Sequence, residues 1–128
     1  MVAYSFKQRF VAPIRAGTKR QTIRADRKRH AYPGEQLQLY TGMRTRECKL
    51  IGRAFCFCVL PIVLIFDDDP SHEEGFIVQG GGMFASIDAF AIADGFASWA
   101  DLKAFWRENH PGIDEFQGNL IKWGDLDA

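Results

Sequence analysis

Short runs of strand-forming residues, separated by turn signals, constrain the fold of this 128-residue chain more than any other feature. Within residues 36–41, two leucines alternate with two glutamines, a pattern typical of a half-buried strand. A Pro33-Gly34 turn precedes this run, and Gly42 follows it. Comparable runs predict about six short strands, at residues 2–6, 22–24, 36–41, 47–57 with its extension 59–66, 76–79 and 116–123.

Two or three helices accompany these strands. Apolar residues four apart predict a helix within residues 7–16. Ser86 is a candidate N-cap for an apolar helix that ends at residue 93, and Ser98 begins a clearer helix that extends to about Asn109. Together the segments predict an α+β domain built on a small, barrel-like mixed sheet.

Composition limits the class of protein. A chain of this length with 47% hydrophobic and 25% charged residues is one globular domain, residues 1–128, and is not disordered. The apolar stretch 54–66 is interrupted by Pro61 and falls short of the roughly 20 residues that cross a bilayer. An odd number of cysteines, two of them at Cys56 and Cys58, indicates free thiols in a reducing compartment. We therefore expect a cytoplasmic protein with no membrane partner.

Neither a metal nor a cofactor is expected. The three histidines and three cysteines lack the paired spacings of a zinc site. Three aspartates at residues 67–69, directly before Pro70, are more typical of a solvated turn than of a ligand set. Residues 80–82 are all glycine, but no Lys-Ser/Thr pair follows them as in a phosphate-binding loop, so they predict a mobile loop or lid.

Charge is distributed unevenly along the chain. Residues 1–53 contain thirteen of the sixteen Lys and Arg residues, whereas residues 54–128 contain thirteen of the sixteen Asp and Glu residues. Such segregation can create a positive face that suits a phosphate or polyanion partner. It can equally be satisfied internally, by basic segments that pack beside acidic loops. The pattern alone leaves both interpretations open.

Residues 17–24 combine a glycine, a lysine, a threonine and an arginine at one junction. Gly17 is placed to end a short helix, because glycine adopts the left-handed cap conformation without steric cost. Alternation along the following strand puts Thr22 and Arg24 on one face and Ile23 on the other, with Lys19 beside them. A hydroxyl, an amine and a guanidinium held this way could bind an oxyanion or perform acyl transfer. A solvated basic turn is the alternative.

Several motifs, in this order along nearly the whole chain, resemble the ASCH domain family of the PUA-like superfamily. The Ala-Gly-x-Lys-x-x-Thr-x-Arg stretch at residues 16–24 is the most specific of them. The similarity is closest to short bacterial ASCH proteins such as the N4-acetylcytidine amidohydrolases. The other matching segments are residues 6–10, 32–35, 94–96, 99–106, 110–112 and 121–123.

This resemblance implies a PUA-like barrel of about six strands, with two or three flanking helices and a cleft for a modified nucleoside or single-stranded RNA. It implies amide hydrolysis of an N4-acylated cytidine, with Thr22 as nucleophile, Lys19 as base and Asp94 as supporting carboxylate. The amidohydrolases have glutamate where this chain has Asp94 or, without a one-residue gap, Gly95. Further residues expected to contact the substrate are Arg9, Arg20, Arg24 and Tyr32.

Two other functions use the same surface. The first is a module that binds single-stranded RNA without hydrolysis, with a phosphate track of Arg27, Lys28 and Arg29. In that case Tyr32, Tyr40 or Trp123 could stack on an unpaired base. The second is a weak ribonuclease that uses His30 as acid or base, with Lys19 and Arg24 stabilising charge.

Overall fold

The structure is a computed structural model that describes residues 1–80 and 86–127. Its described part is a mixed α+β fold of six strands and three α-helices, with a short 3-10 turn, η1 (Gln8–Phe10), before the first helix. The helices are α1 (Val11–Ala16), α2 (Ile87–Ala93) and α3 (Trp99–Asn109). The strands are β1 (Val2–Phe6), β2 (Gln21–Arg24), β3 (Gln36–Thr41), β4 (Lys49–Ile65), β5 (Gly75–Val78) and β6 (Glu115–Trp123).

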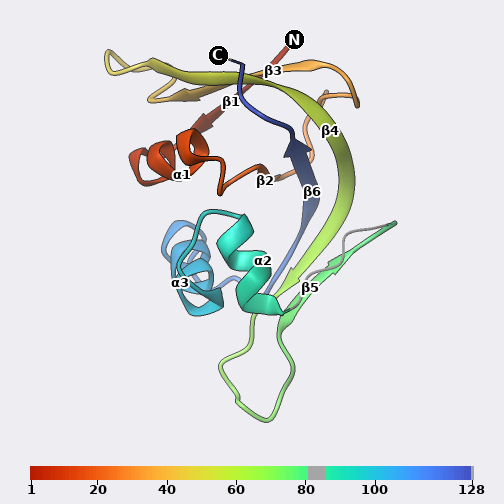
Figure 1. The fold of residues 1–128 in the computed structure, drawn as a ribbon. Coiled ribbons are helices and arrows are strands. Elements are labelled where there is room, and N and C mark those ends of the chain that lie inside the picture. Colours follow the sequence, from red (N-terminus) through yellow and green to blue (C-terminus); the bar gives the residue numbers. More distant parts are fainter. Residues whose placement is uncertain (81–85, 128) are drawn as a thin grey trace.

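All six strands form one sheet, in the order β1-β3-β4-β6-β2, with β5 paired to β4. The β1–β3 pairing is parallel and the others are antiparallel. The strand β4 is long and strongly curved, and it joins β3 at one end to β6 and β5 at the other (Figure 1). The two predicted runs 47–57 and 59–66 are therefore one central strand. A β-bulge interrupts the β3–β4 register at Ile51, next to Gly52, because Ile51 has no partner on β3.

The predicted barrel does not close, because no backbone pairing within the described residues joins β1 to β2, the two ends of the sheet. Arginine side chains bridge this seam instead. The Nη2 of Arg24 donates to the Ser5 carbonyl at 2.6 Å, and the Nη2 of Arg27 lies 3.5 Å from the Ala3 carbonyl.

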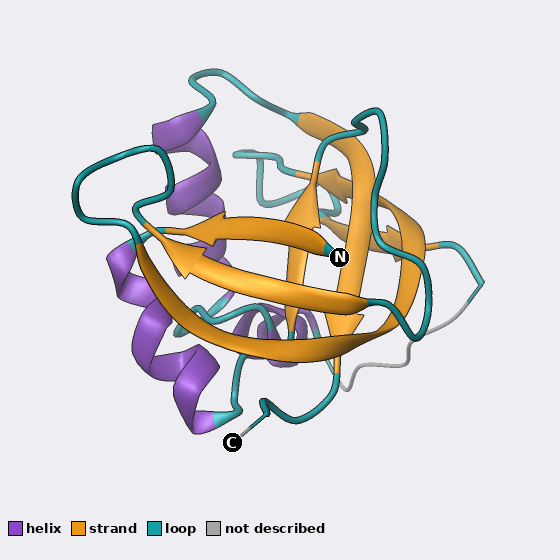
Figure 2. Ribbon diagram, turned by 90° about the horizontal axis from the view of Figure 1, so that it is seen from above, coloured by secondary structure: helices purple, strands orange, loops and turns teal. Residues whose placement is uncertain are grey.

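The helices lie on one side of the sheet (Figure 2). Both predicted N-caps are confirmed: the Ser86 hydroxyl accepts from Ala89 N at 3.0 Å, and the Ser98 hydroxyl accepts from Asp101 N at 3.2 Å. The apolar face of α3 buries Leu102 and Trp106 in the core.

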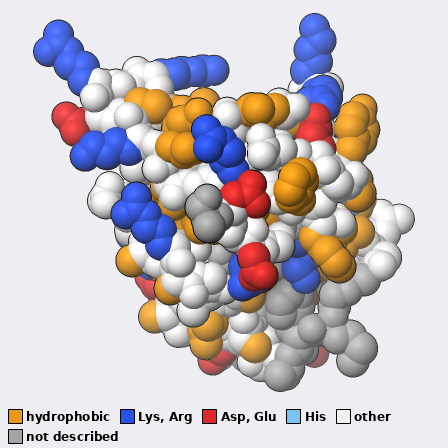
Figure 3. All heavy atoms as spheres, turned by 45° about the horizontal axis from the view of Figure 1, so that its top comes forward, with side chains coloured by type: hydrophobic (Ala, Val, Ile, Leu, Met, Phe, Trp, Pro, Cys, Tyr) orange, Lys and Arg blue, Asp and Glu red, His pale blue; other side chains and the backbone are white. Residues whose placement is uncertain are grey.

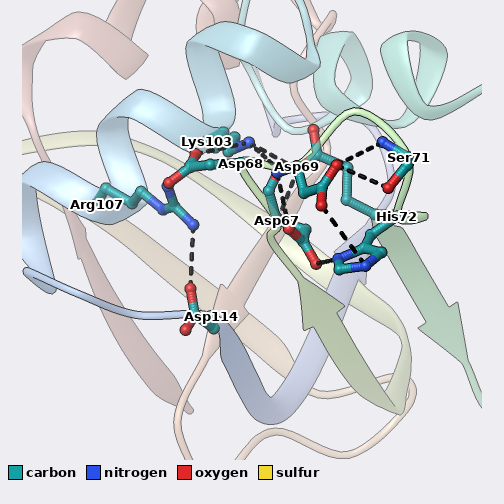
Figure 4. A network of polar contacts seen from close by, with 9 residues as sticks. Asp67, Asp68, Asp69, Ser71, His72, Lys103, Arg107 and Asp114 are labelled. Atoms are coloured by element: carbon teal, nitrogen blue, oxygen red, sulfur yellow. Dashed lines mark hydrogen bonds and ion pairs between the residues drawn. The ribbon is translucent and has the colours of Figure 1, made fainter.

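The aspartates at 67–69 form part of an ion-pair network rather than a merely solvated turn (Figure 4). Lys103 of α3 lies 3.3 Å from Asp68 and 2.8 Å from Glu74, and Arg107 also pairs with Asp68. Arg107 further contacts Asp114, at 3.2 Å. The β4–β5 loop is thereby tied to α3 and to the chain just before β6. Of the predicted glycine loop, residues 81 and 82 lie outside the described residues.

Candidate active site

A pocket of about 280 Å³ opens at the seam between β1 and β2. Residues 5–7 line it from β1 and residues 22–25 line it from β2. Two polar side chains, Lys19 and Asp94, join Thr22 and Arg24 at one part of the wall. Aromatic side chains form most of the remaining wall. They come from β1, η1, the chain before α3, α3 itself and β6: Phe6, Phe10, Phe96, Phe105, Trp106 and Phe116.

Lys19 reaches this pocket because the chain turns sharply after α1. Gly17 takes the predicted left-handed conformation, with φ of 80°, and the amides of Thr18 and Lys19 both donate to the Pro13 carbonyl at 3.1 Å. The lysine side chain is 2% exposed. Its Nζ donates to the backbone carbonyl of Asp94 at 2.5 Å and lies 3.7 Å from Oδ1 of that residue. The solvated basic turn that the sequence left open is therefore wrong for Lys19, because Asp94 and Gly95, in the segment between α2 and α3, pack against its side chain.

Asp94 is the C-cap of α2, and its carboxyl is buried together with the amine of Lys19. Gln21 Nε2 donates to Asp94 Oδ1 at 3.2 Å, so the carboxyl is held from the strand as well. Asp94, and not Gly95, therefore supplies the carboxyl group at the site. Gly95 contributes only its backbone, against which the Lys19 side chain packs. The sequence could have identified Gln21 as a site residue. Alternation places it on the core-facing side of β2 with Ile23, and a buried amide requires a hydrogen-bond partner.

Burial decides the protonation of this pair. The sequence left open whether desolvation or the neighbouring carboxylate has the larger effect on Lys19, because the two act in opposite directions. In the structure desolvation dominates and lowers the pKa of Lys19 to about 8, while Asp94 opposes the shift. Burial likewise raises the pKa of Asp94, against the opposing effects of Lys19 and Gln21. An amine with a pKa near 8 is neutral in a useful fraction of molecules at neutral pH.

Arg24 controls the hydroxyl of Thr22. Its Nε donates to Thr22 Oγ1 at 2.9 Å, which occupies an acceptor position of the hydroxyl and leaves the hydroxyl proton available to a base. Both Lys19 and Thr22 are described, and no direct hydrogen bond joins them. A guanidinium against the oxygen would also stabilise negative charge that develops there.

Donors for an oxyanion are fewer than the sequence suggested. The amides that follow Gly17 are committed to the Pro13 carbonyl, so they do not point into the pocket. On Arg24, Nε and Nη2 are engaged with Thr22 and Ser5. Among the described residues, Nη1 of Arg24 has no hydrogen-bond partner, so it is one donor that this side chain still offers to a substrate oxygen.

Three residues predicted to contact substrate lie outside the pocket lining. Arg9 packs over the rings of Phe96 and two other phenylalanines and pairs with Asp101 at 2.6 Å, so it supports the aromatic wall from behind. Arg20 pairs with Asp125 at 2.5 Å, away from the site. Tyr32 is exposed beside Arg29, near the N-terminus.

The predicted phosphate track is largely used within the protein. Arg27 lies over the ring of Tyr4, 4.5 Å from its centroid, and donates to the carbonyl of Arg29. Arg29 pairs with Glu35 and helps to hold the pKa of that carboxyl at about 2. Only Lys28 of the three makes no side-chain hydrogen bond or ion pair with another described residue.

The aromatic residues proposed to stack on a base are also placed elsewhere. Trp123 is buried in the core against Phe6, and Tyr40 is half-buried with its hydroxyl on Gln38. Of the aromatic rings that do line the pocket, Phe105 and Trp106 come from α3 and Phe116 comes from β6. His110 joins them, stacked on Trp106 with centroids 5.2 Å apart.

Gly95 positions the lysine, which gives a testable prediction. Its φ is 98°, and a Cβ added here would lie 2.7 Å from Lys19 Cδ and 3.0 Å from Phe10 Cδ1. We expect Gly95→Ala to cost about 2–3 kcal/mol in free energy of unfolding, from strain and overpacking. Gly34→Ala is the matched control, since Gly34 has a φ of 88° and nothing within 4 Å of the added Cβ. Urea unfolding of the two variants compares these costs, and equal losses would contradict the close contact.

No group of three or more His, Cys, Asp or Glu residues in the described part of the chain is arranged to hold a metal ion. The described helices include none with the length and apolar character needed to span a bilayer. Comparisons of the chain with protein-family models, with curated proteins and with solved structures gave no match. The residues of the pocket are therefore the structural observation that bears on function.

Proposed function

We propose that this protein is an amidohydrolase that removes the acyl group from an N4-acylated cytidine, on a PUA-like fold whose barrel is open at the β1–β2 seam. The observation that carries the proposal is the convergence of the buried Lys19 amine and the Arg24-bound Thr22 hydroxyl on one ring-lined pocket. A volume of about 280 Å³ suits a single heteroaromatic base better than a whole nucleotide. The resemblance to the N4-acetylcytidine amidohydrolases supports the same assignment.

The reaction would proceed in two balanced halves. Thr22 Oγ1 attacks the amide carbonyl carbon while its proton moves to neutral Lys19, and Arg24 Nη1 binds the oxyanion. The carbon–nitrogen bond then breaks, and the Lys19 ammonium returns the proton to the departing exocyclic amine of cytidine. Water next attacks the Thr22 ester with Lys19 as base, which releases the carboxylic acid and restores the hydroxyl.

Asp94 acts in this scheme as a positioning residue. Lys19 is bound by the backbone carbonyl of Asp94, at 2.5 Å, so its placement does not depend on the length of the carboxylate side chain. This explains how aspartate can replace the glutamate of the amidohydrolases without displacing the amine. The carboxyl tunes Lys19, since its negative charge raises the lysine pKa against desolvation.

The direct test is release of cytidine from N4-acetylcytidine by the purified protein, followed by chromatography. Lys19 must be neutral to accept a proton, so we expect kcat/KM to rise with pH and to level off above about 8. Asp94→Asn removes the charge that raises the Lys19 pKa, and we therefore expect the rising part of its profile at lower pH than in the wild type. A wild-type profile that falls between pH 6 and 9 would contradict a lysine base.

The binding-only alternative remains distinct from this proposal. It would show binding of single-stranded RNA that weakens steeply with salt, without any hydrolysis of N4-acyl substrates. The ribonuclease alternative lacks support at its acid–base residue. Both ring nitrogens of His30 are engaged, with the Tyr4 hydroxyl and the Ala25 carbonyl at 2.9 Å each, and His30 does not line the pocket.

A further inference from the structure

Three exposed cations at the β3–β4 turn (residues 42–48) and the start of β4 have no partner among the residues that the structure describes. Arg44, Arg46 and Lys49 make no side-chain hydrogen bond or ion pair with any described residue. Only one carboxylate, that of Glu47, lies within this segment. In contrast, acidic side chains neutralise several other basic residues of the N-terminal half, namely Arg9, Lys19, Arg20 and Arg29.

The turn holds these side chains outward on a defined backbone. The Thr45 hydroxyl donates to the Gly42 carbonyl at 2.6 Å and accepts from Glu47 N at 3.1 Å. Arg44 has a φ of 66°, and it is the one non-glycine residue with positive φ in the described chain. Glycine would adopt this conformation without strain, so an arginine here costs stability and supplies only its side chain. Strained positions of this kind are concentrated at functional sites.

The same turn lies beside the mouth of the candidate active site. The amide of Met43 donates to Ser5 Oγ at 3.3 Å, and the Thr41 hydroxyl donates to the Phe6 carbonyl at 2.8 Å. Ser5 and Phe6 line the pocket, as does the exposed and unpaired Lys7. Figure 3 shows Lys and Arg side chains projecting from the face it presents, including the left side, where the turn lies in Figure 1. Positive charge therefore extends from the pocket rim onto the turn.

We propose that the β3–β4 turn binds the phosphodiester backbone of a single-stranded polynucleotide while one base of that strand enters the pocket. This inference rests on the proposed function, and it names the substrate as a modified base within RNA rather than a free nucleoside. A strand must be unpaired for its base to reach a ring-lined pocket. Arginines without internal partners, spaced along an exposed turn, suit a row of phosphates.

The experiment compares free N4-acetylcytidine with a short single-stranded RNA that carries one N4-acetylcytidine, and with the matching DNA. The variants are Arg44→Gly and Arg46→Gln, with Arg53→Gln as the control. Arg53 is also exposed and unpaired but lies farther along β4, opposite Gln38. We expect wild-type kcat/KM to be higher for the RNA than for the nucleoside. The slope of the logarithm of the RNA-binding constant against the logarithm of the salt concentration should become shallower by about 1 for each cation removed at the turn.

Arg44→Gly separates function from folding, since glycine relieves the backbone strain. We expect its melting temperature to equal or exceed that of the wild type, its nucleoside activity to be unchanged, and its RNA binding and RNA hydrolysis to fall several-fold. Unchanged RNA binding in Arg44→Gly and Arg46→Gln, with the nucleoside still hydrolysed, would overturn this inference and leave the proposed function intact. Loss of RNA binding in these variants, in a protein that hydrolyses neither substrate, would support the surface and overturn the amidohydrolase. Equal turnover of DNA and RNA would extend the surface to polynucleotides in general.

Discussion

Thr22→Val is expected to lower kcat/KM for N4-acetylcytidine by roughly 10⁴-fold or more, as loss of a nucleophile does in comparable enzymes. Valine keeps the β-branched shape of threonine in β2, opposite Ile121 of β6, and removes only the hydroxyl. The variant leaves Arg24 Nε without its acceptor, at a cost of about 1–3 kcal/mol in free energy of unfolding. The measurement is steady-state release of cytidine, with urea unfolding to confirm that the variant is folded.

Two variants control for this result. Thr22→Ser retains a hydroxyl and should retain turnover. Thr41→Val makes the same substitution at the end of β3. Thr41 does not line the pocket and its hydroxyl donates to the backbone carbonyl of Phe6, so the activity of this variant should stay near that of the wild type. Comparable turnover by Thr22→Val and Thr41→Val would exclude Thr22 as the nucleophile and indicate direct attack by water.

Lys19→Met is expected to lower kcat/KM by about 10³-fold, within the range for loss of a general base. Methionine preserves the apolar stem that lies against Phe10 and Gly95, so the pocket keeps its shape. The substitution leaves the Asp94 carboxyl buried without its cation, which would cost about 3–5 kcal/mol in free energy of unfolding if the carboxyl stayed charged. Because burial already raises the pKa of Asp94, uptake of a proton reduces this cost.

The double variant Lys19→Met/Asp94→Asn separates stability from catalysis. It removes both members of the buried pair, so the free energy of unfolding should recover relative to Lys19→Met alone while activity stays lost. Lys19→Arg retains a positive charge but cannot accept the proton, because a guanidinium is not deprotonated in proteins, and it should also be inactive. Activity restored in the double variant would show that Lys19 only stabilises the fold.

Local patterns were sufficient to predict most elements of the fold. Alternation located β3, two strand-forming runs located the parts of the central strand β4, and the hydroxyl caps at Ser86 and Ser98 located the starts of α2 and α3. Each of these signals depends on residues a few positions apart, which is why a single sequence reveals them. The closure of the sheet depends instead on whether β1 and β2, separated by fourteen intervening residues, pair directly or are bridged by arginines. No local signal reports that choice.

The sequence by itself determined which chemical groups stand at the candidate site: Lys19, Thr22 and Arg24 lie within one cap-to-strand junction, and Gly17 imposes the turn that brings them together. Only the tertiary structure decided their environment. The packing of α3 over the seam converts an exposed basic turn into a pocket, and Asp94 reaches Lys19 from 75 residues away. Burial then sets the lysine pKa, because desolvation depends on the atoms that surround a charge in space and not on its neighbours along the chain.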